Sequence, residues 1–205
     1  MKRFSSIDLD EDLNIYPRRH TYFIHRDLKK EISISNEAWG VKPYWSKDML
    51  TCTRSERMFE SAFWRPFALT QRCLIPASCF FEWHKRADGK KEIYRIQFKK
   101  TDSFCFGGLF GLHIEVKKES FNYSPWITIL TQEGNSLMKE VHNSGENQGR
   151  QPIVIRESDM REWLSPNTVA PNQIYKLIYQ YPESAIEAEP DHPQENSVGD
   201  QLNLF

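Results

Sequence analysis

The sequence predicts a β-rich α+β domain in which antiparallel sheets close on one core, accompanied by a few short helices. Its 205 residues are 39% hydrophobic and 13% aromatic, enough to bury one sizeable core but hardly two. Short runs of β-branched and aromatic residues alternate with polar turn clusters such as KRADGKK, and helical periodicity is confined to three short stretches. We therefore expect a single domain over residues 1–181.

The strand-like runs have the length and composition of half-buried strands. They are TYFIH, EISIS, QRCLIPASCFFEW, EIYRIQF, FCFGGLFGLHIEV, WITILTQ, QPIVI and YKLIY. The helical stretches lie around Glu56 to Phe67, in NSLMKEVH and in ESDMREWL, where Ser158 with its acidic neighbours is the predicted helix start.

The chain from Pro182 onward differs sharply in charge from the rest. It carries six of the 28 acidic residues and neither Lys nor Arg, so the preceding chain has 27 basic against 22 acidic side chains. That surplus suits a local DNA-binding groove and is too small for a general coater of DNA. Acidic, proline-containing and poor in large apolar groups, residues 182–200 are predicted to form a disordered linker.

Several classes of protein are excluded by what the sequence lacks. No apolar run approaches the roughly 18 residues needed to cross a bilayer, and MKRFSSIDLDEDL has no apolar core like that of a signal peptide. We expect a cytoplasmic, nucleoid-associated monomer with no membrane contact. No CxxC pair accompanies His84, so we predict no metal site and no cofactor. The cysteines should be free thiols: Cys52, Cys73, Cys79 and Cys105.

Two titratable residues are candidates for proton transfer. Glu82 lies in RCLIPASCFFEW among apolar and aromatic neighbours, and burial there would raise its pKa towards neutrality. The alternative, an outward-facing Glu82 on an alternating strand, is not excluded by the pattern. His142 ends a short helix in LMKEVHNSGENQGRQPIVI and can shuttle protons near neutral pH, although most isolated histidines are surface or capping residues.

Aromatic and basic residues gather in the segment from WGVKPYW to CTRSERMF. Exposed aromatic faces with interleaved arginines form a platform for unpaired bases and phosphates. Trp45 is the candidate stacking residue, Trp39 is expected in the core, and Arg54 and Arg57 follow closely. Core tryptophans beside a solvated charge cluster are the competing interpretation.

Taken together and in order, these motifs resemble the SOS response-associated peptidase family over roughly Trp39 to Leu164. The relevant pieces are WGVKPYW, CTRSE, RCLIPASCFFEW, the GGLFGL run, and VH followed by RQPIVI and REWL. Members of that family process abasic sites in single-stranded DNA. The resemblance implies active-site roles for Glu82 and His142.

The same resemblance implies DNA-binding residues. Arg54 and Arg150 would hold phosphates flanking the lesion, Arg3 belongs to the opening RF pair, and Trp45 would pack against a base or sugar edge. Cys52 occupies the place of an asparagine that in the family helps position the sugar or the aldehyde adduct. The GENQG insertion lengthens the loop before Arg150.

The amino terminus departs from the family pattern, in which a cysteine directly after the initiator methionine is the nucleophile. Here the chain begins Met1, Lys2, Arg3, Phe4, so the family's thiazolidine crosslink cannot form. The α-amine of Met1, with a reference pKa of about 7.7–8.0, or the ε-amine of Lys2 could still form a Schiff base with the sugar aldehyde.

These features support two functions. The first is an enzyme that reacts with abasic sites in single-stranded DNA during the damage response, by Schiff-base crosslinking or lyase chemistry. The second is a non-catalytic module that reads single strands or junctions. A peptidase acting on other proteins is a weaker third.

The last five residues, QLNLF, resemble the sliding-clamp-binding pentapeptide of bacterial polymerases and repair proteins. Apolar residues at the tip of an acidic tail are out of place unless a partner buries them. The resemblance implies that a bacterial-type sliding clamp takes up four of them: Gln201, Leu202, Leu204 and Phe205. The competing interpretation is a final strand packed on the protein's own core.

Overall fold

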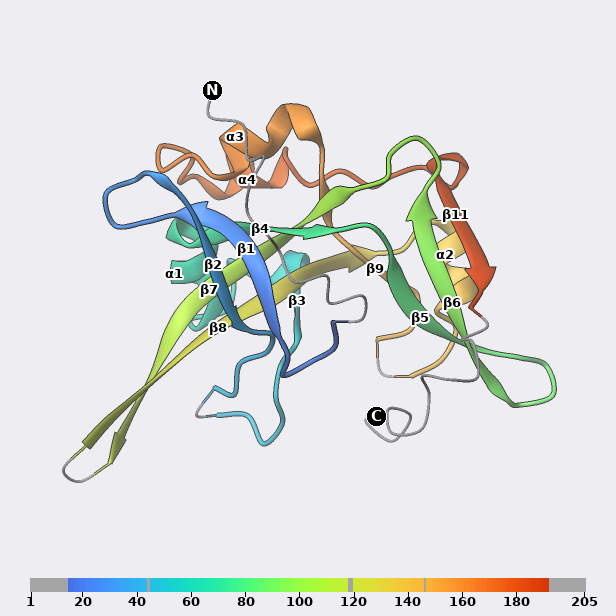
Figure 1. Cartoon of the computed structure of the whole chain (residues 1–205), viewed down its shortest axis with the longest axis horizontal. Coiled ribbons are helices and arrows are strands. Elements are labelled where there is room, and N and C mark those ends of the chain that lie inside the picture. Colours follow the sequence, from blue (N-terminus) through green and yellow to red (C-terminus); the bar gives the residue numbers. More distant parts are fainter. Residues whose placement is uncertain (1–14, 44, 118–119, 146, 192–205) are drawn as a thin grey trace.

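The computed structural model describes residues 15–43, 45–117, 120–145 and 147–191. Their strands form two β-sheets, and short helices pack around the sheets and at their ends (Figure 1). The β-rich α+β fold expected from the sequence is confirmed. No helix in this part of the chain has the length and apolar character required to span a membrane.

The larger sheet has eight strands in the described part of the chain, and its main path runs β2, β1, β4, β7, β8, β3. β10 pairs with β7 and β9 with β8. All pairings are antiparallel except that of β3 with β8, which is parallel and departs from the purely antiparallel sheets predicted. The strands are β1 (His20–Arg26), β2 (Ile32–Ala38), β3 (Cys52–Arg54), β4 (Arg72–Ala77), β7 (Phe104–Lys117), β8 (Ser120–Glu133), β9 (Arg150–Pro152) and β10 (Val154–Ile155).

The smaller sheet is antiparallel and runs in the order β11, β6, β5. It comprises β5 (Phe80–Lys85), β6 (Lys91–Phe98) and β11 (Ile186–Pro190). The run QRCLIPASCFFEW, expected as one strand, is thus divided between β4 in one sheet and β5 in the other.

The helices are short. They are α1 (Trp64–Thr70), α2 (Ser136–Val141), α3 (Met160–Trp163) and α4 (Pro171–Tyr175), with single 3₁₀ turns η1 (Ser55–Arg57), η2 (Glu157–Asp159) and η3 (Glu183–Ala185). The helix predicted in NSLMKEVH is α2, and it begins where the side chain of Asn135 accepts a hydrogen bond of 2.9 Å from the backbone N–H of Met138.

The glycines of the GGLFGL run in β7 let α1 and the side chains of the neighbouring strands pack closely against the β7 backbone. A methyl group at Gly111 would lie 2.5 Å from both Phe67 of α1 and Trp126 of β8. At Gly108 it would lie 2.7 Å from Ile75 and 2.8 Å from the backbone oxygen of Thr128. These contacts are shorter than van der Waals separation, so the close packing of the core requires glycine at both positions.

Three predicted features are wrong. YKLIY is not a strand, because Tyr175 ends α4 and the chain then turns with Ile174 and Leu177 buried at helical spacing. Ser158 does not begin a helix: Arg156 precedes η2 and Asp159 precedes α3.

The third error concerns the predicted linker 182–200. Its first part forms η3 and then β11, which pairs with β6, because Ile186 is buried in the core with only 3% of its surface exposed. The rest of the linker from residue 192, and the QLNLF peptide, lie outside the described residues.

Candidate active site

The end of β8 gathers the first residues of the site. β3 pairs with β8 so that Arg54 lies opposite Thr131, while β9 pairs with β8 and places Arg150 opposite Glu133. Within β3 the side chain of Thr53 is buried, so Cys52 and Arg54 face the opposite side together. The two arginines that lie far apart in the sequence therefore meet at one end of one strand.

Arg150 is held by a fixed set of acceptors. Its Nε donates to the Thr131 hydroxyl at 3.1 Å, and its Nη2 donates to the Thr131 backbone oxygen at 2.9 Å and to Glu56 Oε2 at 2.8 Å. Only 14% of its side chain is exposed. The guanidinium beside Glu56 also lowers the pKa of that carboxyl against the opposing effect of burial. Arg150 therefore presents Nη1 in a constrained direction.

His142 follows the last turn of α2 and is fixed by backbone contacts. Its own N–H donates to the Met138 oxygen at 2.9 Å, and its carbonyl accepts from Gly149 N–H at 2.6 Å. The ring Nδ1 lies 3.3 Å from the backbone oxygen of Arg150. A carbonyl only accepts, so we assign the proton to Nδ1, which leaves the Nε2 lone pair available.

β5 brings Glu82 to this histidine. Glu82 Oε2 lies 3.5 Å from His142 Nδ1, and the two side chains are 22% and 14% exposed. The strand is clamped to the end of α2, because the Asn143 amide accepts from Lys85 N–H at 2.8 Å and donates to the Lys85 oxygen at 2.9 Å. His84 adds a contact of 3.1 Å to the Val141 oxygen. The outward-facing alternative for Glu82 is therefore wrong.

Burial shifts the two partners in opposite directions. It raises the pKa of Glu82 to about 8 and lowers the pKa of His142, whose bond to the Arg150 carbonyl opposes that change. At pH 7 the carboxyl of Glu82 is thus mostly protonated and the imidazole of His142 mostly neutral. One group can donate a proton while the other accepts one.

His142 and the two arginines border an open pocket of about 450 Å³, and Glu82 lies behind His142 without lining it. Arg54 lies at its rim, where Nη2 donates to Asn147 Oδ1 at 3.3 Å, so the GENQG insertion forms part of the wall. The lining residues are Arg54, Glu133, Lys139, His142, Asn143, Gln148, Gly149 and Arg150.

Cys52 lies next to this pocket but is a poor nucleophile. The residue retains exposed surface, yet the protein around its sulfur and the nearby Glu82 raise the pKa of the thiol to about 12. The thiolate is therefore scarce at neutral pH. Cys73, Cys79 and Cys105 are likewise free thiols.

The remaining candidates are not brought into this cluster. Trp45 is 50% exposed and packs edge-on against Phe63 at 5.9 Å, and it does not line the pocket. Trp39 is half-buried, with its indole N–H bonded to the Thr51 oxygen. Met1, Lys2 and Arg3 lie outside the described residues.

Sequence reasoning missed the residues that orient the site. Glu56 had a signal, because it stands in the CTRSE motif two residues after Arg54. Thr131 and Asn143 had none, since their roles depend on the register of β8 with β9 and on the contact between α2 and β5.

Known proteins resemble this chain in sequence, and solved structures resemble it in fold. The abasic site processing protein YoqW of Bacillus subtilis is 31% identical over 156 residues, which cover 73% of this chain and 65% of the relative. The abasic site processing protein YoaM of the same organism is 32% identical over 157 residues, covering 73% and 64%. The matches thus span less than two thirds of either relative.

A solved structure of a Bordetella bronchiseptica protein superposes with a TM-score of 0.71 at 20% identity, covering 87% of this chain and 86% of that one. This likeness supports the fold. A family model described as SOS response associated peptidase (SRAP) matches residues 2–198. The chain therefore belongs to the SOS response associated peptidase family.

Proposed function

We propose that this protein binds single-stranded DNA at abasic sites and reacts covalently with the aldehyde of the opened sugar. The observation that carries the proposal is the contact between Glu82 and His142, whose pKa values are shifted in opposite directions beside a pocket bordered by two arginines. The names of YoqW and YoaM, both abasic site processing proteins, support the choice of substrate.

Arg54 and Arg150 bind phosphates of the DNA backbone. Arg54, exposed at the rim, binds a phosphate next to the lesion, and the constrained Arg150 directs Nη1 at a second one. Trp45 contacts a neighbouring base or sugar from outside the pocket, and Arg3 adds a further phosphate contact. Cys52 lies near Glu82 and does not attack the sugar.

The nucleophile is an amine, either the α-amine of Met1 or the ε-amine of Lys2. Its nitrogen adds to C1′ of the aldehyde, and His142 Nε2 takes up the proton that the nitrogen loses and passes it to the former aldehyde oxygen, which gives the carbinolamine. Glu82 then protonates the hydroxyl of the carbinolamine, which leaves as water while the C=N bond of the imine forms. The adduct is reversible by hydrolysis and leads on to β-elimination when a C2′ proton is removed.

A non-catalytic reader of single strands is the second candidate. The lysine that lines the pocket, Lys139, is bonded to Glu133 at 2.5 Å, and the Cys52 thiol is largely protonated at neutral pH, so neither is an activated nucleophile. Under this alternative the arginines bind DNA and no bond to the sugar forms.

Borohydride trapping separates the two functions. Folded protein is mixed with a single-stranded oligonucleotide containing one abasic site, sodium borohydride is added, and the product is mapped by intact and peptide mass spectrometry. The enzyme predicts a reduced adduct on Met1 or Lys2. DNA binding that weakens with salt, without any adduct, establishes the reader instead.

We further propose that the QLNLF peptide docks the protein on a bacterial-type sliding clamp. The glutamine amide of Gln201 would bond clamp backbone groups, Leu202 would fill one pocket, and Leu204 with Phe205 a second. Docking would raise the concentration of the body at freshly exposed single strands, which matters for a body of modest positive charge.

A further inference from the structure

Two lysines face each other on the hairpin that carries Glu82. In the pairing of β5 with β6, Lys85 lies directly opposite Lys91, and both side chains are exposed. Directly opposed residues share a face of the sheet with their Cβ atoms about 5 Å apart, and like charges there are destabilising. Such an arrangement stores a local repulsion that an anion lying between the ammonium groups would relieve.

The acidic residues of the hairpin do not relieve it. Glu82 is paired with His142, and the other two, Asp88 and Glu92, lie against Arg86, with Nη2 3.4 Å from Asp88 and Nη1 3.7 Å from Glu92. Within the described residues, the ion pairs include no acidic partner for Lys85, Lys90 or Lys91. These three residues form what we call the lysine patch.

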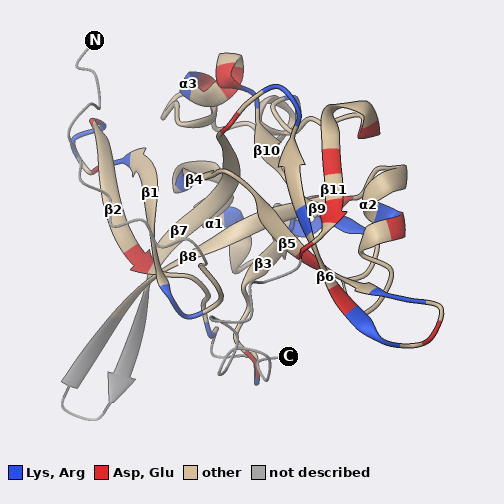
Figure 2. Cartoon of the chain, turned by 45° about the vertical axis from the view of Figure 1, so that its right-hand side comes forward, with Lys and Arg blue, Asp and Glu red and all other residues tan. Residues whose placement is uncertain are grey.

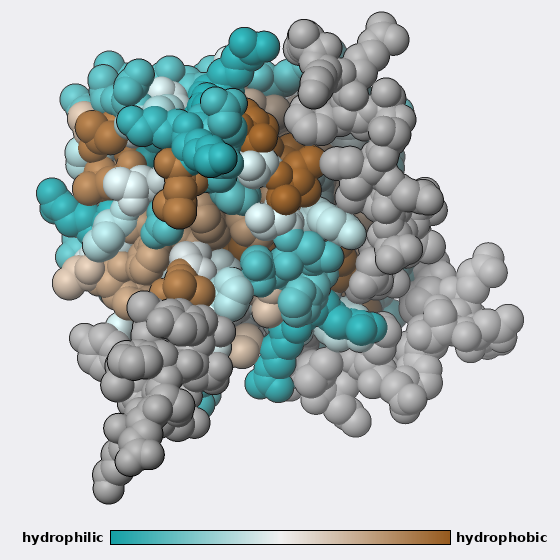
Figure 3. All heavy atoms as spheres, turned by 60° about the vertical axis from the view of Figure 1, so that its left-hand side comes forward, coloured by the Kyte–Doolittle hydropathy of each residue, from teal (hydrophilic) through white to brown (hydrophobic). Residues whose placement is uncertain are grey.

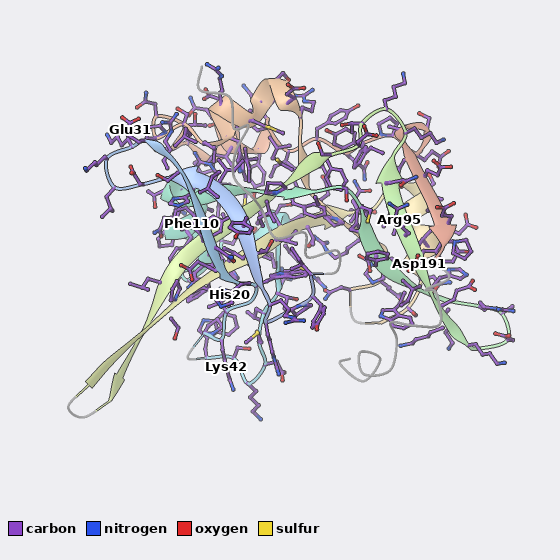
Figure 4. The ribbon with its side chains drawn as sticks, in the orientation of Figure 1. His20, Glu31, Lys42, Arg95, Phe110 and Asp191 are labelled. Atoms are coloured by element: carbon purple, nitrogen blue, oxygen red, sulfur yellow. The ribbon has the colours of Figure 1, made fainter. Side chains whose placement is uncertain are left out.

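Charge is segregated across the small sheet. Figure 2 shows more basic than acidic residues around the turn between β5 and β6, and acidic residues along β11, on the far side of β6. On that side the pKa of Arg95 is raised, mainly by a hydrogen bond with Cys79. The charges of Glu189 and Asp191, which lie near Arg95, add to this effect (Figure 4). A polyanion is therefore repelled from β11 and attracted to the turn.

The lysine patch is tied to the pocket by short, defined connections. β5 runs from Glu82 to Lys85, about 10 Å at 3.3–3.4 Å per residue, and the turn lies about 10 Å further out. The Asn143 amide that lines the pocket holds the backbone of Lys85 by two bonds. Alternation along β5 places Phe81, 39% exposed, on the same face as Lys85 and places Glu82 on the opposite face, so the patch adjoins the pocket through the backbone and the end of the hairpin.

The apolar surface is a weaker candidate for a binding site than the basic turn. On the face turned forward in Figure 3, hydrophobic side chains occur in separate groups among hydrophilic ones. The basic turn at the outer end of the hairpin is the stronger feature.

We propose that the lysine patch binds the phosphates of the single strand on one side of the abasic nucleotide, so that the hairpin extends the binding site beyond the pocket. The proposal rests on the proposed DNA-binding function. Because the patch contacts only phosphates, it adds affinity without sequence specificity. It contributes only when the DNA is long enough to extend from the pocket to the patch.

The test compares two triple variants of equal charge. Lys85→Gln/Lys90→Gln/Lys91→Gln removes the patch, and Lys29→Gln/Lys30→Gln/Lys100→Gln removes three exposed lysines from the β1–β2 and β6–β7 turns. Binding is measured by fluorescence anisotropy on oligonucleotides that carry a tetrahydrofuran abasic analogue, which cannot form an imine. One oligonucleotide has five nucleotides, and two longer ones extend ten nucleotides to either the 5′ or the 3′ side.

The patch variant should lose about tenfold in affinity for one of the two extended oligonucleotides, and the slope of log K against log salt should fall by about 2 for three lost contacts. It should match wild type on the five-mer and on the other extension. Its melting temperature should equal or exceed that of wild type, since a repulsion is removed.

Equal affinity of the two triple variants for all oligonucleotides would overturn the inference, as would an equal loss on both extensions. Wild-type protein that binds none of the oligonucleotides would instead overturn the proposed function.

Discussion

At the scale of single residues, the proposed proton transfer depends on the ring of His142 and on the two groups next to its Nδ1. His142 Nδ1 is 3.3 Å from the Arg150 carbonyl and 3.5 Å from Glu82. The carbonyl selects the tautomer, and the protein around Glu82 keeps the carboxyl protonated near neutrality. Each residue thus has the protonation state that the proposed imine formation requires.

The raised pKa of Glu82 has a measurable effect on stability. Its value of about 8 exceeds the ordinary 4.5, so the folded protein binds more protons than the unfolded chain between these pH values. The free energy of unfolding contributed by this group therefore falls as pH rises through that window, by at most about 1.4 kcal/mol per pH unit.

Glu82→Gln should remove this dependence. Urea denaturation of both proteins from pH 5 to 9 should show a stability difference that grows in favour of the variant up to about pH 8 and is constant above it. Stability curves that stay parallel over the whole range would contradict the assigned pKa.

At the scale of elements, one buried arginine joins α1, β4 and the segment after α3. Arg72 is 5% exposed and donates from Nε to the Trp163 oxygen and from Nη1 to the oxygens of Ala68 and Leu69. Its Nη2 donates to the oxygens of Ser165 and Thr168. Burial lowers the pKa of Arg72 to about 10, so the residue remains charged at neutral pH.

Arg72→Met should destabilise the protein by more than about 3 kcal/mol, because several buried carbonyls at about 1–3 kcal/mol each lose their donor. Arg65→Met, at an exposed position of α1, should change stability by about 0.5 kcal/mol or less. The measurement is chemical denaturation at pH 7. Similar midpoints for the two variants would show that Arg72 does not hold α1, β4 and the segment after α3 together.

Local sequence patterns predicted some elements well and others poorly. α2 and its Asn135 cap follow from short-range chemistry, as do the long strands β7 and β8. YKLIY has strand composition, but Pro171 starts a helix just before it. β11 was missed because one buried residue, Ile186, is enough to hold a strand whose other side chains are mostly exposed.

The site shows the same limit. Glu82 and His142 were predicted from their motifs, whereas the face on which Glu82 points is fixed by the clamp between Asn143 and Lys85. Glu56 and Thr131 hold Arg150 only because segments far apart in the sequence come together. No local sequence pattern predicts such long-range contacts.

At the scale of the whole molecule, the described body ends at β11, and residues 192–200 separate it from the QLNLF peptide. Nine residues span at most about 30 Å at 3.3–3.6 Å each, so a clamp bound to the peptide would lie close to the small sheet. The proposal therefore places the clamp, the hairpin of β5 and β6, and the pocket along the same DNA.

Leu204→Ala/Phe205→Ala should abolish binding to a bacterial sliding clamp in a calorimetric titration, because two hydrophobic anchors are removed. The same variant should react with free abasic oligonucleotide at the wild-type rate. Clamp binding that persists in the variant, or that is absent from wild type, would end the docking proposal.

The proposed role of Glu82 and His142 is proton transfer during covalent attack on an abasic site. Its most direct test is the single-turnover rate of borohydride-trapped adduct at saturating abasic single-stranded DNA, measured from pH 5.5 to 9 for wild type, Glu82→Gln and His142→Gln, with anisotropy confirming that all three bind. We expect rates about 10²–10⁴ lower in each variant, because each loses one proton-transfer group. We also expect a wild-type rate that declines above about pH 8, where Glu82 loses its proton, and no such decline in Glu82→Gln. Variants that form the adduct at the wild-type rate and with the wild-type pH profile would contradict the account.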